Sequence, residues 1–169
     1  SANTDGLTGV NNRKALDDYL RSLVERNNVT RLPFSLLMMD LDNFKQLNDI
    51  YGHTVGDRML LAFADKCQAA VRSNDFLARY GGEEFTLILP GASLRNATKK
   101  AKHMCQAIAA ARYAADDSPS ADVVSVTVSI GVSVYRSGDT VKSLLDRADQ
   151  CLYKAKATGK NRVVAENAL

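Results

Sequence analysis

The stretch RYGGEEF, residues 79–85, places two glycines and two adjacent carboxylates between segments rich in strand-forming residues. Residues 76–80 (FLARY) and 85–90 (FTLILP) flank it, and two such runs joined by a glycine-containing turn are typical of a β-hairpin. Gly81 and Gly82 lack side chains, which would also let a nucleotide approach the backbone closely. Taken alone, the hairpin is equally compatible with glycines that only form the turn and acids that only solubilise its tip.

A second pair of carboxylates ends a different strand-like segment. Residues 34–42 (FSLLMMDLD) form a continuous apolar run that closes on Asp40 and Asp42, as expected of a central strand whose end meets solvent. Neighbouring strands lie only about 4.8 Å apart, so pairing this strand with the hairpin would bring these acids close to Glu83 and Glu84. Carboxylates this close repel one another unless a cation compensates them, and Mg²⁺ accepts carboxylate and backbone carbonyl oxygens. The sequence therefore predicts a magnesium site where the strand end meets the turn.

Helical and strand-like segments surround these two features. Apolar residues recur at helical spacing in five segments, which we expect to form helices: residues 12–26, 43–50, 57–72, 93 to about 113, and 140–157. Residues 123–135 (VVSVTVSIGVSVY) alternate and predict a long strand, and residues 161–165 predict a short edge strand. Because strands and helices do not alternate strictly, we predict an α+β (mixed α/β) fold with a central, largely antiparallel sheet flanked by helices. A length of 169 residues suits one domain.

The composition is that of an ordinary folded domain: 46% of the residues are hydrophobic, 24% are charged, and the formal net charge is +3. The charges are spread along the chain, which argues against nucleic-acid binding, and no apolar run approaches the roughly 20 residues that span a bilayer. Cys67, Cys105 and Cys151 lack metal-ligand spacing, as expected of reduced core thiols in the cytoplasm. The pattern of Asp5–Thr8 fits a cap that ties an N-terminal arm to the domain. We expect residues 1–169 to be one cytoplasmic domain of a longer sensor protein.

Six segments, in this order, resemble the signature motifs of the GGDEF family of diguanylate cyclases, and together they extend over nearly the whole chain. They are DGLTGVNNR (5–13), DLDNFKQLND (40–49), GHTVGD (52–57), GGEEF (81–85), VTVSIGVS (126–133) and ADQCLYKAKATGKN (148–161). This family joins two GTP molecules into cyclic di-GMP and releases two pyrophosphates, and its fold is similar to the palm of nucleotide cyclases and polymerases. Since each such domain holds one GTP, the resemblance implies a homodimer for ring closure.

The resemblance also implies roles for the acidic residues. The metal ligands would be Asp40, the backbone carbonyl of Leu41, and Glu83, holding Mg²⁺ or, in its place, Mn²⁺. Glu84 would share in the metal shell. In the family's reaction, the 3′-hydroxyl of one GTP attacks the α-phosphorus of the other. The catalytic roles would fall to Glu83 and Glu84, with Glu83 as the candidate acceptor of the hydroxyl proton.

Further residues correspond to the nucleotide site of the family. Asn48 and Asp57 match the positions that recognise guanine. The Asp57 carboxylate can accept the N–H donors of the base, and the Asn48 amide can pair with both its donor and its acceptor atoms. The other expected substrate contacts lie beside the nucleotide, in the glycine turn or at the terminal phosphates: Phe44, Lys45, Gly81, Gly82, Lys156 and Lys160. Lys160 stands where the family often has arginine, so it would act as a point charge rather than a bidentate donor.

Residues 72–75 (RSND) match the RxxD inhibitory site of the family, where the cyclic product would bind through Arg72 and Asp75. A second arginine on the following helix often completes this site, and here Lys99 or His103 would replace it. Two functional classes remain open. One is an active cyclase, and the other is an inactive module that binds GTP or cyclic di-GMP as a regulatory sensor. The intact acids at the hairpin favour the enzyme.

Overall fold

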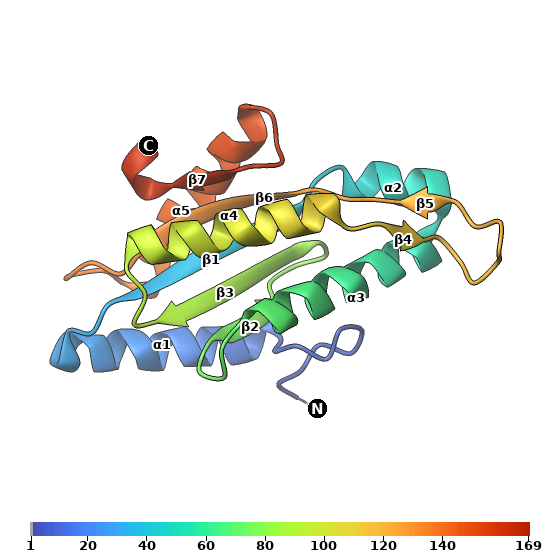
Figure 1. Cartoon of the computed structure of the whole chain (residues 1–169). Coiled ribbons are helices and arrows are strands. Elements are labelled where there is room, and N and C mark those ends of the chain that lie inside the picture. The colour runs from blue at the N-terminus through green and yellow to red at the C-terminus, as the bar shows by residue number, and fades with distance from the viewer. Residues whose placement is uncertain (1) are drawn as a thin grey trace.

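The computed structural model describes residues 2–169, and its main sheet lies between helices on both faces (Figure 1). The helices are α1 (Arg13–Thr30), α2 (Phe44–Tyr51), α3 (His53–Ala70), α4 (Leu94–Ala110), α5 (Val141–Ala157) and the 3₁₀ turn η1 (Glu166–Ala168). The strands are β1 (Phe34–Leu41), β2 (Phe76–Arg79), β3 (Glu84–Pro90), β4 (Tyr113–Ala114), β5 (Val123–Val124), β6 (Val128–Val134) and β7 (Val163–Ala165).

Five of these strands form the main sheet, in the order β2-β3-β1-β6-β7. The pairs β2/β3, β3/β1 and β1/β6 are antiparallel, whereas β7 adds to β6 in parallel. A separate two-stranded ribbon, β4 with β5, projects beyond the sheet near α2 (Figure 1). The predicted mixed fold with a largely antiparallel central sheet is therefore confirmed.

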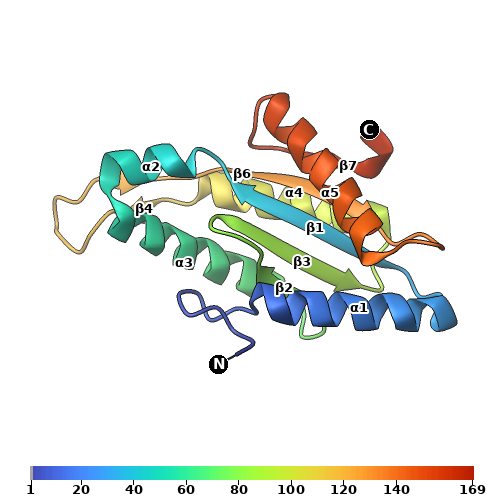
Figure 2. The ribbon, with the colours of Figure 1, turned by 180° about the vertical axis from the view of Figure 1, so that it is seen from behind.

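Alternation along β1 decides which helix each of its side chains meets. Leu37 and Leu41 pack in the core cluster that contains residues of α3 and α4, whereas Leu36 and Met38 pack with residues of α1 and α5. Figure 2 shows α1 and α5 together in front of the sheet, with α3 and α4 behind it. Because side chains alternate along a strand, Asp40 emerges on the same face as Met38, toward α5. Every residue of β1 is buried, which explains its continuous apolar sequence.

Capping side chains start three helices where the sequence indicates. Asn12 accepts a hydrogen bond from the backbone of Ala15 at the start of α1, and Ser93 does the same for Asn96 in α4. Thr140 opens α5 in a capping box. Such caps satisfy backbone N–H groups that have no partner inside the helix.

Several predicted boundaries were wrong. The helix expected over residues 12–26 continues to Thr30. The helix expected from residue 57 begins at His53, directly after Gly52 reverses the chain with a φ of 89°. The helix expected to reach about residue 113 ends at Ala110. The long strand expected over residues 123–135 is split into β5 and β6. The ladder between β1 and β6 ends at Leu41 and Val128, one further bond joins the Asp42 backbone N to the Thr127 carbonyl at 2.9 Å, and β5 pairs with β4 instead.

The N-terminal arm is tied to the hairpin, as the Asp5–Thr8 pattern predicts. Asp5 Oδ2 accepts hydrogen bonds from the Thr8 backbone N at 2.9 Å and the Thr8 hydroxyl at 2.7 Å. The same carboxylate forms an ion pair with Arg79, at the end of β2. Asn11 continues the contact by bridging to Ala78. The arm therefore supports the strand that leads into the glycine turn.

Two further expectations concern the core and the membrane. Cys67, Cys105 and Cys151 are all free and buried, in agreement with core thiols. No helix within residues 2–169 combines the length and the apolar character needed to cross a bilayer.

Candidate functional site

The predicted acids of the strand end and the hairpin meet at one edge of the sheet. In the antiparallel pairing of β1 and β3, Asp40 is the direct partner of Glu84. Directly paired side chains on one face lie about 5 Å apart at Cβ. Asp40 is 6% exposed and Glu84 is half-buried, so water screens their repulsion only partly. This confirms that strand pairing brings the two acidic segments together.

A lysine from α5 compensates this negative charge. Lys156 Nζ forms an ion pair with Asp40 Oδ2 at the mouth of the site. The lysine reaches Asp40 because both lie on the α5 face of the sheet, and its own side chain remains 37% exposed. The resemblance to the GGDEF family assigned Lys156 to the nucleotide phosphates. The structure places it beside Asp40, one of the acids that would bind metal.

The electrostatics of the acidic pair follow from burial and mutual repulsion. Burial raises the pKa of Glu84, and the Asp40 carboxylate raises it further, against the opposing effect of Lys156. Burial also raises the pKa of Asp40, although the hydrogen bond from Lys156 works in the opposite direction. A bound divalent cation would stabilise both ionised forms.

Asp42 is buried and hydrogen-bonded within the protein, so its role is structural. Its carboxylate accepts hydrogen bonds from the Thr127 hydroxyl at 2.7 Å, the Ser129 hydroxyl at 2.6 Å and the Asn161 backbone N at 2.9 Å. These contacts tie the end of β1 to β6 and to the segment after α5. The sequence grouped Asp42 with the other acids because nothing local shows which carboxylates are already hydrogen-bonded.

The predicted metal ligands suit a hard cation by their chemistry. The Leu41 backbone N donates to the Glu83 carbonyl at 3.2 Å, which holds the strand end against the turn. Asp40, the Leu41 carbonyl and Glu83 offer only oxygen donors, as Mg²⁺ requires. Within residues 2–169 no cluster of three or more acidic, histidine or cysteine side chains is arranged around a common metal position. Phosphate and water oxygens would therefore complete the octahedron.

Arg79 holds the glycine turn, a role that the sequence analysis missed. Its Nη2 donates to the Gly82 carbonyl at 2.7 Å and its Nε donates to the Gly81 carbonyl at 3.2 Å, while Nη1 contacts Asp5. A turn with so few side chains of its own needs external donors for its carbonyl groups. The arginine two positions before Gly81 was the available signal.

The residues predicted to meet the nucleotide lie on α2, at the start of α3, in the turn between β2 and β3, and in and just after the last turn of α5. Phe44 is buried at the start of α2, and Lys45 beside it is exposed. Lys160, in the left-handed backbone region with a φ of 62°, donates from Nζ to Asn43 Oδ1 at 2.7 Å. Lys160 and Lys156 thus reach the same end of the sheet from one segment.

The two guanine-recognition candidates lie on α2 and α3, on either side of the connection between these helices. Asp57 is exposed on α3, and its carboxylate is accessible to a ligand. Asn48 projects from α2, and its Oδ1 is buried without a hydrogen-bond partner among residues 2–169. The exposed Asp57 carboxylate is an acceptor, which suits a base that presents N–H donors, and the Asn48 amide contains both a donor and an acceptor group.

Arg72 and Asp75 line a separate open cavity of about 480 Å³ between the end of α3 and the start of α4. Asp75 Oδ2 accepts a hydrogen bond from the Arg72 backbone N at 2.8 Å, so this bond does not involve the Arg72 guanidinium. Lys99 and His103, the predicted replacements for a second arginine, line the same cavity. The structure therefore gathers all four residues in one place.

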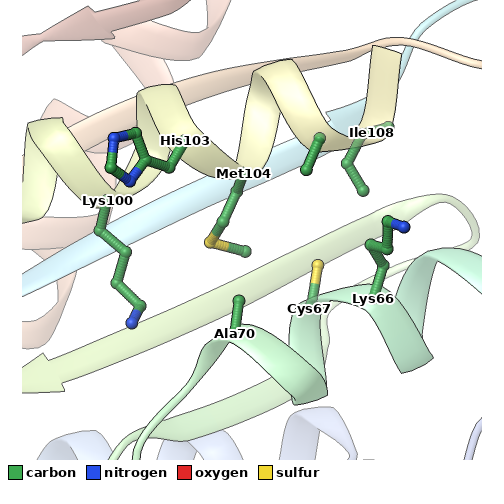
Figure 3. A pocket seen from close by; sticks show the side chains of 8 residues that line it. Lys66, Cys67, Ala70, Lys100, His103, Met104 and Ile108 are labelled. Atoms are coloured by element: carbon green, nitrogen blue, oxygen red, sulfur yellow. The ribbon is translucent and has the colours of Figure 1, made fainter. Parts of the chain in front are cut away.

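A smaller cavity adjoins it between α3 and α4 (Figure 3). Cys67 and Met104 contribute apolar surface, and the Lys100 side chain extends from α4 toward Ala70 of α3 (Figure 3). Lys100 and His103 border both cavities. His103 is the one predicted site residue that the two cavities share.

Comparisons with known proteins agree with this geometry. The family model described as "Diguanylate cyclase, GGDEF domain" matches residues 2–162. The chain is 40% identical over 166 residues to the response regulator PleD of Caulobacter vibrioides, covering 98% of this chain and 36% of that protein. It is 41% identical over 161 residues to the diguanylate cyclase VdcA of Vibrio cholerae, covering 95% of this chain and 46% of that protein. The chain thus spans less than half the length of these curated relatives.

Solved structures show the same fold. The GGDEF domain of DgcB from Caulobacter crescentus, in complex with c-di-GMP, superimposes with a TM-score of 0.94 at 33% identity, covering 98% of this chain and 94% of that one. The active GGEEF domain of a diguanylate cyclase from Vibrio cholerae gives a TM-score of 0.83 at 32% identity, covering 92% and 96% of the two chains. With its GGEEF turn, its paired acids and this likeness over nearly its full length, the chain belongs to the GGDEF domain family of diguanylate cyclases.

Proposed function

We propose that this chain is the catalytic domain of a diguanylate cyclase, which condenses two GTP molecules into cyclic di-GMP and releases two pyrophosphates. The observation that carries the proposal is the cross-strand pairing of Asp40 with Glu84, with Lys156 beside them. Two carboxylates this close repel each other, and Lys156 supplies a single positive charge, so a bound divalent cation would relieve the remaining negative charge. Family membership and the intact acids support the same conclusion.

The acidic edge would hold Mg²⁺, or Mn²⁺ in its place, through Asp40, the Leu41 carbonyl and Glu83. Such a cation neutralises phosphate charge and lowers the pKa of an attacking hydroxyl. Glu83 and Glu84 are the candidate acceptors of the 3′-hydroxyl proton, and the raised pKa of Glu84 brings its basicity closer to that task. Lys156 and Lys160 would bind the triphosphate, for which Lys156 would leave Asp40.

The base would be recognised at the α2–α3 connection. Guanine presents N–H donors that the Asp57 carboxylate can accept, and the Asn48 amide can pair with both donor and acceptor atoms of the base. Adenine would leave the carboxylate unpaired, which is a strong basis for discrimination. Phe44 and Lys45 would lie along the nucleotide, and Gly81 and Gly82 would let the phosphates approach the turn.

Ring closure needs two domains facing each other, because each would hold one GTP and supply one attacking hydroxyl. The assembly we propose is therefore a homodimer during catalysis. The cyclic product would bind in the cavity of Arg72 and Asp75, where Lys99 and His103 add positive charge. Product bound there would restrain the domains and inhibit further synthesis.

The test is to incubate the purified domain with GTP and Mg²⁺ and to identify the products. An active cyclase gives cyclic di-GMP and two pyrophosphates per product, at a rate that rises more steeply than linearly with protein concentration. Nucleotide binding without turnover, in protein freed of bound product and at high concentration, would contradict the proposal.

The Arg72 cavity favours a second candidate function, a nonproductive module that binds cyclic di-GMP. Titration calorimetry with cyclic di-GMP on the wild type and on Arg72→Ala measures that binding without any turnover. An inactive wild type that binds cyclic di-GMP through Arg72 would identify this sensor function instead of the enzyme.

A further inference from the structure

Gly56 occupies a position where helix propensity favours another residue. It lies in the first turn of α3, is buried, and its φ is not in the left-handed region that glycine alone tolerates. Glycine inside a helix costs about 1 kcal/mol relative to alanine. Backbone geometry therefore gives no reason for glycine here, and the reason must lie in what surrounds it.

The neighbour that requires glycine is Asn48. A Cβ atom on residue 56 would lie 1.8 Å from Asn48 Oδ1 and 2.9 Å from Asn48 Cγ. It would also lie 3.3 Å from Cζ of Phe44, the first residue of α2. The carboxamide of Asn48 thus fills the volume that any larger residue at position 56 would take.

In this place the Asn48 Oδ1 has no hydrogen-bond partner within residues 2–169, although it is buried. A buried acceptor without a partner is unfavourable, and such groups are rare unless a ligand satisfies them. The Oδ1 instead lies in the space beside Gly56, against the first turn of α3. The unpaired Oδ1 therefore marks the Asn48 carboxamide as a group whose position is not explained by its own hydrogen bonding.

We propose that Gly56 is a positioning residue for guanine recognition, which acts by leaving the space that the Asn48 Oδ1 occupies against α3 and thereby fixing how the rest of the carboxamide is presented to the base. This inference rests on the proposed function, because it takes guanine as the ligand. Gly56 itself touches no ligand. Its effect passes entirely through Asn48.

The substitution Gly56→Ala separates this role from a packing role. The conflict is with the tip of a side chain that can rotate away, so the fold should survive, and the alanine should even favour the helix. The displaced carboxamide would no longer meet the base. We expect the dissociation constant for the α,β-methylene analogue of GTP, whose P–C–P bridge resists cleavage, to rise about tenfold.

The measurement is a double-mutant cycle by titration calorimetry with this analogue and Mg²⁺, using wild type, Gly56→Ala, Asn48→Ala and the double variant. Removing the carboxamide vacates the space beside residue 56, so the double variant should bind no more weakly than Asn48→Ala alone. Gly6→Ala is the matched control, since a Cβ there meets nothing within 4 Å. Its affinity and melting temperature should equal those of the wild type.

The remaining outcomes overturn the inference. They are wild-type affinity in Gly56→Ala, independent losses that multiply in the double variant, or a melting temperature of Gly56→Ala that falls by more than about 5 °C, which would indicate a packing defect. A wild type that fails to bind the analogue at all would instead contradict the proposed function. The two ideas therefore fail in distinguishable ways.

Discussion

Asp40 and Glu84 are direct partners in the antiparallel pairing of β1 and β3, and Lys156 from α5 pairs with Asp40 on the same face of the sheet. The arrangement joins three distant parts of the chain at one edge. Removing each of the three side chains should have a different consequence. Asp40 is buried and paired, Glu84 is half-buried, and the Lys156 side chain is 37% exposed.

Replacing Glu84 with glutamine should remove cyclase activity while preserving product binding. The variant keeps the size of the side chain but loses the charge that would face the metal and the hydroxyl, so we expect kcat to fall at least roughly 100-fold. The Arg72 cavity lies between α3 and α4, away from this edge, so the affinity for cyclic di-GMP should stay unchanged. Turnover assays and titration calorimetry measure the two quantities. Loss of both together would show that the two sites are not separate.

Replacing Lys156 with methionine should make the fold more dependent on divalent cations. The variant leaves the buried Asp40 carboxylate without its cation, and we expect a loss of about 1–2 kcal/mol in EDTA, less than for a fully buried pair because Lys156 is 37% exposed. Added MgCl₂ should raise the melting temperature of this variant more than that of the wild type.

The control for this prediction is Lys142→Met, which removes an exposed pair with Asp146 and should leave the melting temperature unchanged with or without magnesium. An equal magnesium response in Lys156→Met and in the wild type would show that the acidic edge does not take up the cation.

Replacing Asp42 with alanine should destabilise the domain irrespective of metal. Three donors, from Thr127, Ser129 and Asn161, would lose their common acceptor, at a cost of about 3 kcal/mol in the free energy of unfolding. Urea unfolding with and without MgCl₂ should give the same loss. Asp40→Asn is the comparison: it should keep the fold and weaken magnesium-dependent GTP binding. An Asp42→Ala variant as stable as the wild type would rule out the structural role.

The pair of Asp139 with Arg147 should make part of the stability depend on pH. Burial by itself raises the pKa of Asp139, but hydrogen bonds from Arg147, Ser143 and the Arg136 backbone outweigh it and lower the pKa to about 2. Because this lies below the ordinary value of 3.8, the folded state favours the ionised carboxyl. Its stabilisation is complete above pH 3.8 and is lost as the pH falls through about 2.

Asp139→Asn tests this directly. We expect the variant to lose about 2 kcal/mol of unfolding free energy at pH 7, with the difference from the wild type narrowing as the pH falls below about 4. Urea titrations across this range measure the difference. Asp146→Asn, which removes only an exposed ion pair, serves as the control. A difference that stays constant down to about pH 2 would mean that the carboxylate charge contributes nothing.

Much of the architecture could be predicted from local pattern. The period of apolar residues identified the helices, and the continuous apolar run of residues 34–41 identified the buried central strand. Boundaries were less predictable, because they depend on partners. Residues 125–127 alternate like a strand but lie beyond the end of β1, and His53 starts a helix only because Gly52 turns the chain.

By itself, the sequence determined that acidic residues end a central strand and occupy a glycine turn, since residue type and spacing are local properties. Only the tertiary structure decided which of them meet. The register of β1 against β3 pairs Asp40 with Glu84, and the packing of α5 brings Lys156 to Asp40. The pairing of β1 with β6 places Ser129 where its hydroxyl donates to the Asp42 carboxylate. The space beside Gly56 likewise exists only once α2 and α3 pack together. Such contacts depend on the placement of whole elements, which no local pattern encodes.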